Sequence, residues 1–190
     1  MKHIRFSVHP FAAAGLFLLF FAAPRAYAFA VISSVLLHEM GHATAALLLG
    51  RQIREIKLVP AGISIGLASP ASYREEFLIA AAGPLMSLLY AAASLLMPPS
   101  LGATVRTVTL LLACLNLLPI LTLDGGRMNF AWLSSLFGED IARRALTATT
   151  SLCLAVLWVF SLYIFFYSGV NFTLLLFCAY LFSYLIVKKL

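Results

Sequence analysis

Six apolar segments, each close to the length that crosses a bilayer, constrain this chain more than any other feature. A membrane-spanning helix needs about 20 mostly apolar residues. Of the 190 residues, 63% are hydrophobic and 11% are charged, whereas a soluble domain is about half apolar and a quarter charged. We therefore expect a single membrane-embedded domain over 1–190, an all-α polytopic protein with about six transmembrane helices. The predicted spans are 7–23, 26–49, 77–97, 102–121, 145–166 and 170–187.

The first predicted span resembles a secretory signal peptide. The basic residues Lys2 and Arg5 precede it, and Ala26-Tyr27-Ala28, which matches an A-x-A cleavage site, follows it. Further apolar segments follow at once, so we expect it to be retained. Of the thirteen Lys and Arg residues, eleven lie on one side of the predicted spans. Cytoplasmic loops carry the excess of basic residues. The charges therefore predict a multi-pass protein of the cell membrane with both termini and the two larger loops, 50–76 and 124–144, in the cytoplasm.

The distribution of the basic residues and the loop after the second span give two further indications. The basic residues occur singly or in pairs, which gives no patch for nucleic acid. The loop after the second span contains REIKLVPAGISIGLA, residues 54–68, where β-branched residues alternate with small ones around Pro60-Ala61-Gly62. This pattern favours a small β-hairpin after the second span. An ordinary interfacial loop is the equally weighted alternative.

The segment HEMGH, residues 38–42, places three ionisable side chains inside the second span. Such residues are costly in a membrane and mark functional sites. On a helix His38 and His42 share one face, so the two imidazoles can hold one metal ion. Glu39 lies beside them as a general base for a water molecule. Two imidazoles and a carboxylate suit zinc with one position left open.

A third protein ligand is expected, and Asp124 is the preferred candidate. It ends the apolar run 114–128 at the cytoplasmic end of the fourth predicted span, on the membrane side that the loop charges assign to HEMGH. We expect Gly125 and Gly126 to allow a tight backbone turn beside it. The alternative is a helix-end carboxylate paired with Arg127. A glutamate of the first large loop, Glu75 or Glu76, is the rival ligand.

The chain resembles the site-2 protease family of intramembrane metalloproteases (peptidase family M50). The resemblance rests on HExxH in one span, AAGPLMS (81–87) in the next and NLLPILTLDGG (116–126) in a later one. The six-span layout and VHPF (8–11) look most like the stage IV sporulation factor B branch, which cleaves a membrane-tethered pro-sigma factor. The resemblance implies one zinc ion on His38, His42 and Asp124, with Glu39 as catalytic base and Asn116 near the substrate.

Three departures from the family pattern are visible. Many relatives have proline where this chain has Thr122, and asparagine where it has Ser87. We expect neither to touch the metal chemistry. The sporulation branch carries a C-terminal nucleotide-sensing domain, whereas this sequence ends at Leu190, just after the last span. The resemblance implies a membrane-tethered protein substrate and leaves room for membrane-embedded regulators.

Two alternatives without protease activity remain. A transporter or proton pathway can use intramembrane His38, Glu39 and Asp124. An inactive scaffold can retain the same residues. Asn116 likewise has a structural alternative, a hydrogen bond that packs helices.

Overall fold

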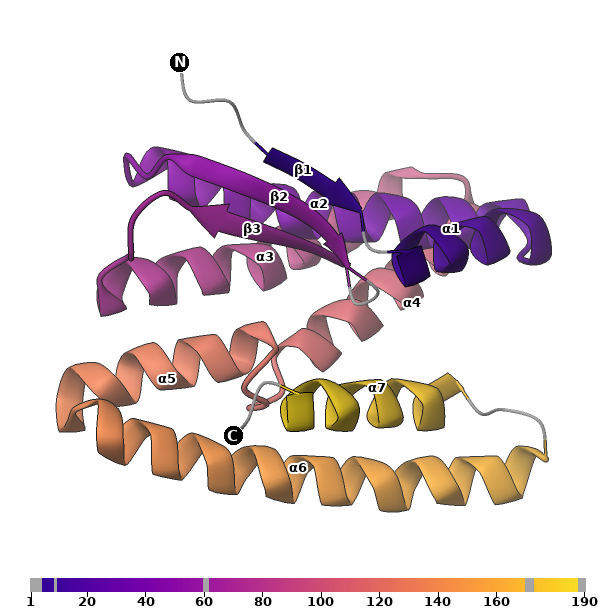
Figure 1. Cartoon of the computed structure of the whole chain (residues 1–190). Coiled ribbons are helices and arrows are strands. Elements are labelled where there is room, and N and C mark those ends of the chain that lie inside the picture. The colour runs from indigo at the N-terminus through magenta and orange to yellow at the C-terminus, as the bar shows by residue number, and fades with distance from the viewer. Residues whose placement is uncertain (1–4, 9, 60–61, 170–172, 188–190) are drawn as a thin grey trace. The chain divides into compact units, whose positions relative to one another are not determined.

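The computed structural model describes residues 5–8, 10–59, 62–169 and 173–187. It divides the chain into two compact units, Met1–Leu117 and Leu118–Leu190. Figure 1 shows the first unit as a small sheet with helices α1 to α4, and the second as helices α5 to α7. Each unit is described by itself, and the single domain expected over 1–190 stays a prediction.

Four α-helices and a short 3-10 helix build the first unit. The turns between them are marked in the sequence: Pro24 precedes α2, and Pro99 is the first residue of α4. Ser72 and Glu75 form a reciprocal capping box at the start of α3. The elements are α1 (Pro10–Ala22), α2 (Arg25–Leu48), α3 (Tyr73–Ala93), η1 (Ser94–Leu96) and α4 (Pro99–Asn116).

Hydrogen bonds between polar side chains join α2 to its neighbours. The Ser34 and Thr109 hydroxyls, both fully buried, lie 2.6 Å apart and connect α2 to α4. Tyr90 donates to the Ser33 hydroxyl over 2.9 Å and connects α3 to α2. Hydroxyl pairs of this kind are a common way to hold apolar helices together, because lipid gives no hydrophobic drive for their association.

The sheet contains the predicted hairpin and one further strand. β2 (Ile53–Val59) pairs antiparallel with β3 (Gly62–Leu67), which confirms the hairpin. The predicted turn at Pro60 and Ala61 lies outside the described residues. β1 (Arg5–Val8) pairs in parallel with the other side of β2, so the strand order is β1-β2-β3. The sequence reading missed β1, because four residues are too few to show alternation.

Three helices build the second unit. α5 (Asp124–Phe137) and α7 (Thr173–Val187) both pack against α6 (Glu139–Ser168), as Figure 1 shows. Gly138, with a φ of 84°, makes the one-residue connection from α5 to α6, a backbone conformation that side chains disfavour. The hydrophobic core of this unit is formed by four buried apolar residues: Ile120, Leu123, Leu154 and Leu181.

The expected end of the fourth span was wrong. The fourth span was expected to reach residue 121, but α4 ends at Asn116. Pro119 lacks the N–H that a continuing helix needs, and the run stays apolar because Ile120 and Leu123 enter the core of the second unit. The large loop expected over 124–144 is mostly helical, since it contains α5 and the start of α6.

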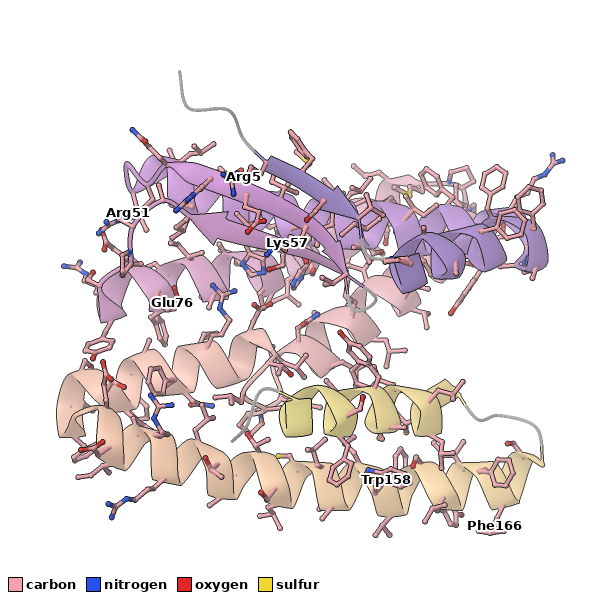
Figure 2. The ribbon with its side chains drawn as sticks, viewed as in Figure 1. Arg5, Arg51, Lys57, Glu76, Trp158 and Phe166 are labelled. Atoms are coloured by element: carbon pink, nitrogen blue, oxygen red, sulfur yellow. The ribbon has the colours of Figure 1, made fainter. Side chains whose placement is uncertain are left out.

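Three described helical segments are long and apolar enough to cross a membrane: Arg25–Leu48, Tyr73–Leu96 and Glu139–Ser168. Shorter apolar helices cover Ala12–Ala22 and Leu174–Ser183. Phe166 on α6, 79% exposed, projects outward in Figure 2, as a lipid-facing side chain does. The composition and these helices are those of a membrane protein, and the count of six spans stays a prediction.

Candidate functional site

The two histidines of HEMGH lie on the buried face of α2. His38 and His42 are only 3% and 5% exposed. Ser34, His38 and His42 follow one another at four-residue intervals along the helix, which places them in one stripe. Gly41 lies in the same stripe and lets α3 approach closely, because a Cβ there would collide with the backbone of Ala82. The motif is therefore at the α2–α3 contact.

The ring nitrogens of the two histidines are arranged as metal ligands are. Their Nε2 atoms face each other at 3.3 Å. Two zinc–nitrogen bonds of about 2.0–2.1 Å at a tetrahedral angle place the nitrogens about 3.3–3.4 Å apart. The pair therefore has the separation that one zinc ion requires, and the residues fit the ion.

The other nitrogen of each ring is held by α3. His42 Nδ1 lies 2.7 Å from the Ile79 carbonyl oxygen, which can only accept a hydrogen bond. In the neutral ring the proton is therefore on Nδ1, and Nε2 carries the lone pair. His38 Nδ1 lies 2.9 Å from the Ser87 hydroxyl. Metal-bound histidines usually have such a partner on the second nitrogen.

Gly83 on α3 provides the space for both rings. A Cβ built at this position would lie 2.9 Å from His38 Nε2 and closer still to the His42 ring. Cβ atoms essentially never approach other atoms that closely. The glycine of the glycine-proline pair is thus required by the imidazoles themselves.

Glu39 lies on the side of α2 that meets the sheet. Its Oε1 accepts the Ile63 backbone N–H over 3.3 Å. Ile63 belongs to β3, and β3 lies at one edge of the sheet. The glutamate of the motif is therefore held between the histidine pair and an edge strand.

Asp124 belongs to the second unit, where it is the first residue of α5 and only 5% exposed. Its Oδ1 accepts a hydrogen bond from Arg127 over 3.3 Å, so the ion pair named as the alternative is present, and the role as a metal ligand stays a prediction. The expected glycine turn is wrong: Gly125 and Gly126 are helical and buried. Gly126 is needed for a close approach, because a Cβ there would collide with the Ile120 carbonyl.

Glu75, the rival third ligand, is engaged elsewhere. Arg51 lies beside the start of α3 (Figure 2) and binds Glu75 through two nitrogens, with Nε 3.1 Å from Oε1. Glu75 also accepts hydrogen bonds from Ser72 at the start of α3. Its carboxylate thus caps α3 and pairs with Arg51, which follows the end of α2.

Asn116 is the last residue of α4. Its side-chain amide donates to the Leu112 carbonyl over 3.1 Å, within its own helix. The alternative of a bond between helices is not seen among the described residues. Its predicted role near the substrate stays a prediction.

Two residues were undervalued by the sequence reading. The Ser87 hydroxyl is within hydrogen-bond distance of a His38 ring nitrogen, a contact that was not expected, and the expectation that Ser87 does not touch the metal chemistry stays a prediction. Thr122, the other departure, has a buried hydroxyl without a hydrogen-bond partner among the described residues. The sequence does not show whether a single polar residue is buried. The available signal was spacing, because Ser87 falls four residues after Gly83 and therefore on the same side of the helix.

Comparisons with known proteins agree with this geometry. The Peptidase M50B-like family model matches residues 11–138. Stage IV sporulation protein FB of Bacillus subtilis is 35% identical over 136 residues, which cover 66% of this chain and 47% of that protein. A zinc metalloprotease of Methanocaldococcus jannaschii is 32% identical over 114 residues, which cover 55% of this chain and 33% of that protein.

The chain thus spans less than half the length of these two curated relatives. A solved structure of the site-2 protease from Methanocaldococcus jannaschii matches with a TM-score of 0.70 at 23% identity, over 96% of this chain and 90% of that one. This likeness shows a shared fold. The family model covers more than half of the sequence, and this chain therefore belongs to the Peptidase M50B-like family.

Proposed function

We propose that this chain is an intramembrane zinc metalloprotease that cleaves a membrane-tethered protein at a site facing the cytoplasm. The observation that carries the proposal is the facing pair of imidazoles, 3.3 Å apart at Nε2, with Glu39 beside it. Membership of the M50B-like family supports the protease class. The relative from Methanocaldococcus jannaschii that is 32% identical is itself a zinc metalloprotease.

We assign one zinc ion to His38, His42 and Asp124. The chemistry of the donors supports this set, because zinc takes two imidazoles and a carboxylate in hydrolytic sites. Among the described His, Asp and Glu residues, these three are the buried ones. Burial without a compensating charge is costly for a carboxylate, and a bound zinc ion would supply positive charge beside the buried Asp124.

Zinc, when bound, supplies a Lewis acid that polarises a peptide carbonyl and makes water more acidic. The residues of the chain do the rest. Glu39 accepts the proton of the attacking water and returns it to the leaving amine. The Ile63 N–H holds the Glu39 carboxylate on the sheet side of the motif. Glu39 is therefore the general acid and base of this proposal.

The substrate in this proposal is a transmembrane or juxtamembrane segment that unwinds before cleavage. The edge strand β3 can pair with the unwound segment, because an extended peptide adds readily to an exposed sheet edge. The bond from the Ile63 N–H to Glu39 supports this, since it shows that this amide points away from β2. We place Asn116 near the substrate, as the family pattern implies.

The sidedness follows from the eleven basic residues that the predicted topology places together. The likeness to a stage IV sporulation protein supports a pro-sigma factor as one candidate substrate. That relative is matched over 47% of its length, so the substrate is a proposal for this chain.

The test is co-expression with a panel of candidate membrane-tethered transcription factors, comparing wild type with Glu39→Gln. The amide keeps the size of the side chain and removes its basicity. We expect cleavage to be lost and zinc to remain bound. Substantial cleavage by Glu39→Gln would contradict the role of Glu39.

The metal assignment has its own control. Asp124→Ala should lose zinc, as measured by atomic absorption of the purified protein. The double variant Glu75→Ala/Glu76→Ala should keep it. The reverse pattern would replace Asp124 with a glutamate of the first unit. Purified wild type without stoichiometric zinc would refute the metalloprotease and favour the transporter alternative.

A further inference from the structure

The face of α3 that meets the histidines carries three different features at four-residue intervals. Ile79 offers its carbonyl oxygen to His42 Nδ1, and Ser87 offers its hydroxyl to His38 Nδ1. Gly83 lies between them and leaves room for both rings. Residues four apart lie on one side of a helix, so this stripe meets both imidazoles at once.

The two hydrogen-bond partners differ in kind. The Ile79 carbonyl belongs to the backbone and is present whatever the side chain. Ser87 provides a side chain, whose hydroxyl lies 2.9 Å from His38 Nδ1. It is 1% exposed, and the bond is buried. Water is therefore poorly placed to substitute for the hydroxyl.

We propose that Ser87 is a positioning residue for the metal ligand His38, a role that rests on the proposed zinc site. For His38 to bind a metal through Nε2, its remaining proton must be on Nδ1. The Ser87 hydroxyl accepts that proton in a hydrogen bond, and thereby fixes both the tautomer and the angle of the ring. The serine acts through His38 and needs no contact with substrate.

The test uses variants of the full-length protein in detergent. Ser87→Ala removes the hydroxyl with little change in volume, and Ser87→Thr keeps it. Ser94→Ala is the matched control. Ser94 is equally buried, in η1, directly after α3, but its hydroxyl donates to the Ala91 carbonyl and does not contact the histidines. Thermal unfolding of each variant measures any general packing cost.

The first readout is zinc affinity, from competition with a chromophoric chelator. We expect Ser87→Ala to bind zinc about 10–100-fold more weakly, the usual effect of losing such a partner. Ser87→Thr and Ser94→Ala should stay within about threefold of wild type on the same scale. The second readout is the visible spectrum of the cobalt-substituted protein. It should shift in Ser87→Ala alone, because the His38 ring changes its orientation.

Two results would overturn the inference. One is Ser87→Ala with wild-type zinc affinity and an unchanged cobalt spectrum. The other is an equal loss of affinity in Ser94→Ala or Ser87→Thr, which would assign the effect to packing and not to the hydroxyl. Failure of the proposed function is separate, because it would appear as wild-type protein that binds no zinc, or that binds zinc and cleaves nothing.

Discussion

The substitution Gly83→Ala tests whether the close contact between α3 and the two imidazoles is what shapes the metal site. A single methyl group would be added at a helical position where alanine is otherwise preferred. Helix propensity therefore predicts a small gain in stability. The structure predicts the opposite for metal binding, because the new Cβ would lie 2.9 Å from His38 Nε2 and nearer to His42.

The size of the effect follows from these distances. An ordinary van der Waals contact begins at 3.4 Å, so His38 Nε2 must move by about 0.5 Å and the His42 ring by more. Metal sites tolerate deviations of only about 0.2 Å in ligand distance. At least one zinc–nitrogen bond should therefore be lost. We expect zinc affinity to fall by about 100-fold or more. Removing a hydrogen-bond partner of a metal-bound histidine already lowers metal affinity by up to about 100-fold, and here a ligand itself is displaced.

The assay is zinc retention during dialysis against chelators of increasing strength, followed by atomic absorption. Gly102→Ala is the packing control, since its Cβ would collide with the Ser94 carbonyl in the α4 contact, away from the histidine rings. Gly15→Ala is the neutral control, with nothing within 4 Å. Wild-type zinc affinity in Gly83→Ala would refute the reasoning, and so would an equal loss in Gly102→Ala.

Two further predictions concern contacts around the site. Ile63→Pro removes the backbone N–H that donates to Glu39 and leaves the hydrogen bonds between β2 and β3 in place, because this N–H points away from β2. Losing a hydrogen bond to a charged group costs about 1.5–3 kcal/mol, so cleavage should slow by about tenfold or more while zinc stays bound. An unchanged cleavage rate would count against the edge-strand model. Arg51→Ala breaks the two-nitrogen bond to Glu75 and should lower the temperature of thermal unfolding. Thermal unfolding in detergent would measure this, with exposed Arg54→Ala as control, and equal shifts in both variants would contradict it.

The motif and the hairpin could be predicted because their signals are local. HEMGH places two imidazoles on one side of any helix that contains it, and the buried pair on α2 follows directly. Alternation over 54–68 likewise gives β2 and β3. In both cases the spacing along the chain determines which side chains share a face.

The features that were missed depend on contacts between elements. β1 is a strand only because β2 lies beside it. The run after Asn116 is apolar, as a membrane helix would be, yet it turns at Pro119 and packs its Ile120 into a core. Ser87 is a single serine in an apolar helix, and its position opposite His38 is set by the packing of α2 on α3. Hydrophobicity reports burial in such cases and does not identify what causes it.

The arrangement of the histidine pair has a consequence for how the protein is made. His38, His42 and their partners on α3 all come from one continuous stretch, residues 25–93. Because residues are added in order from the N-terminus, both histidines are made before Asp124. A chain that has not yet reached residue 124 carries two of the three ligands of the proposed site, and the set is complete only once the second unit is being made.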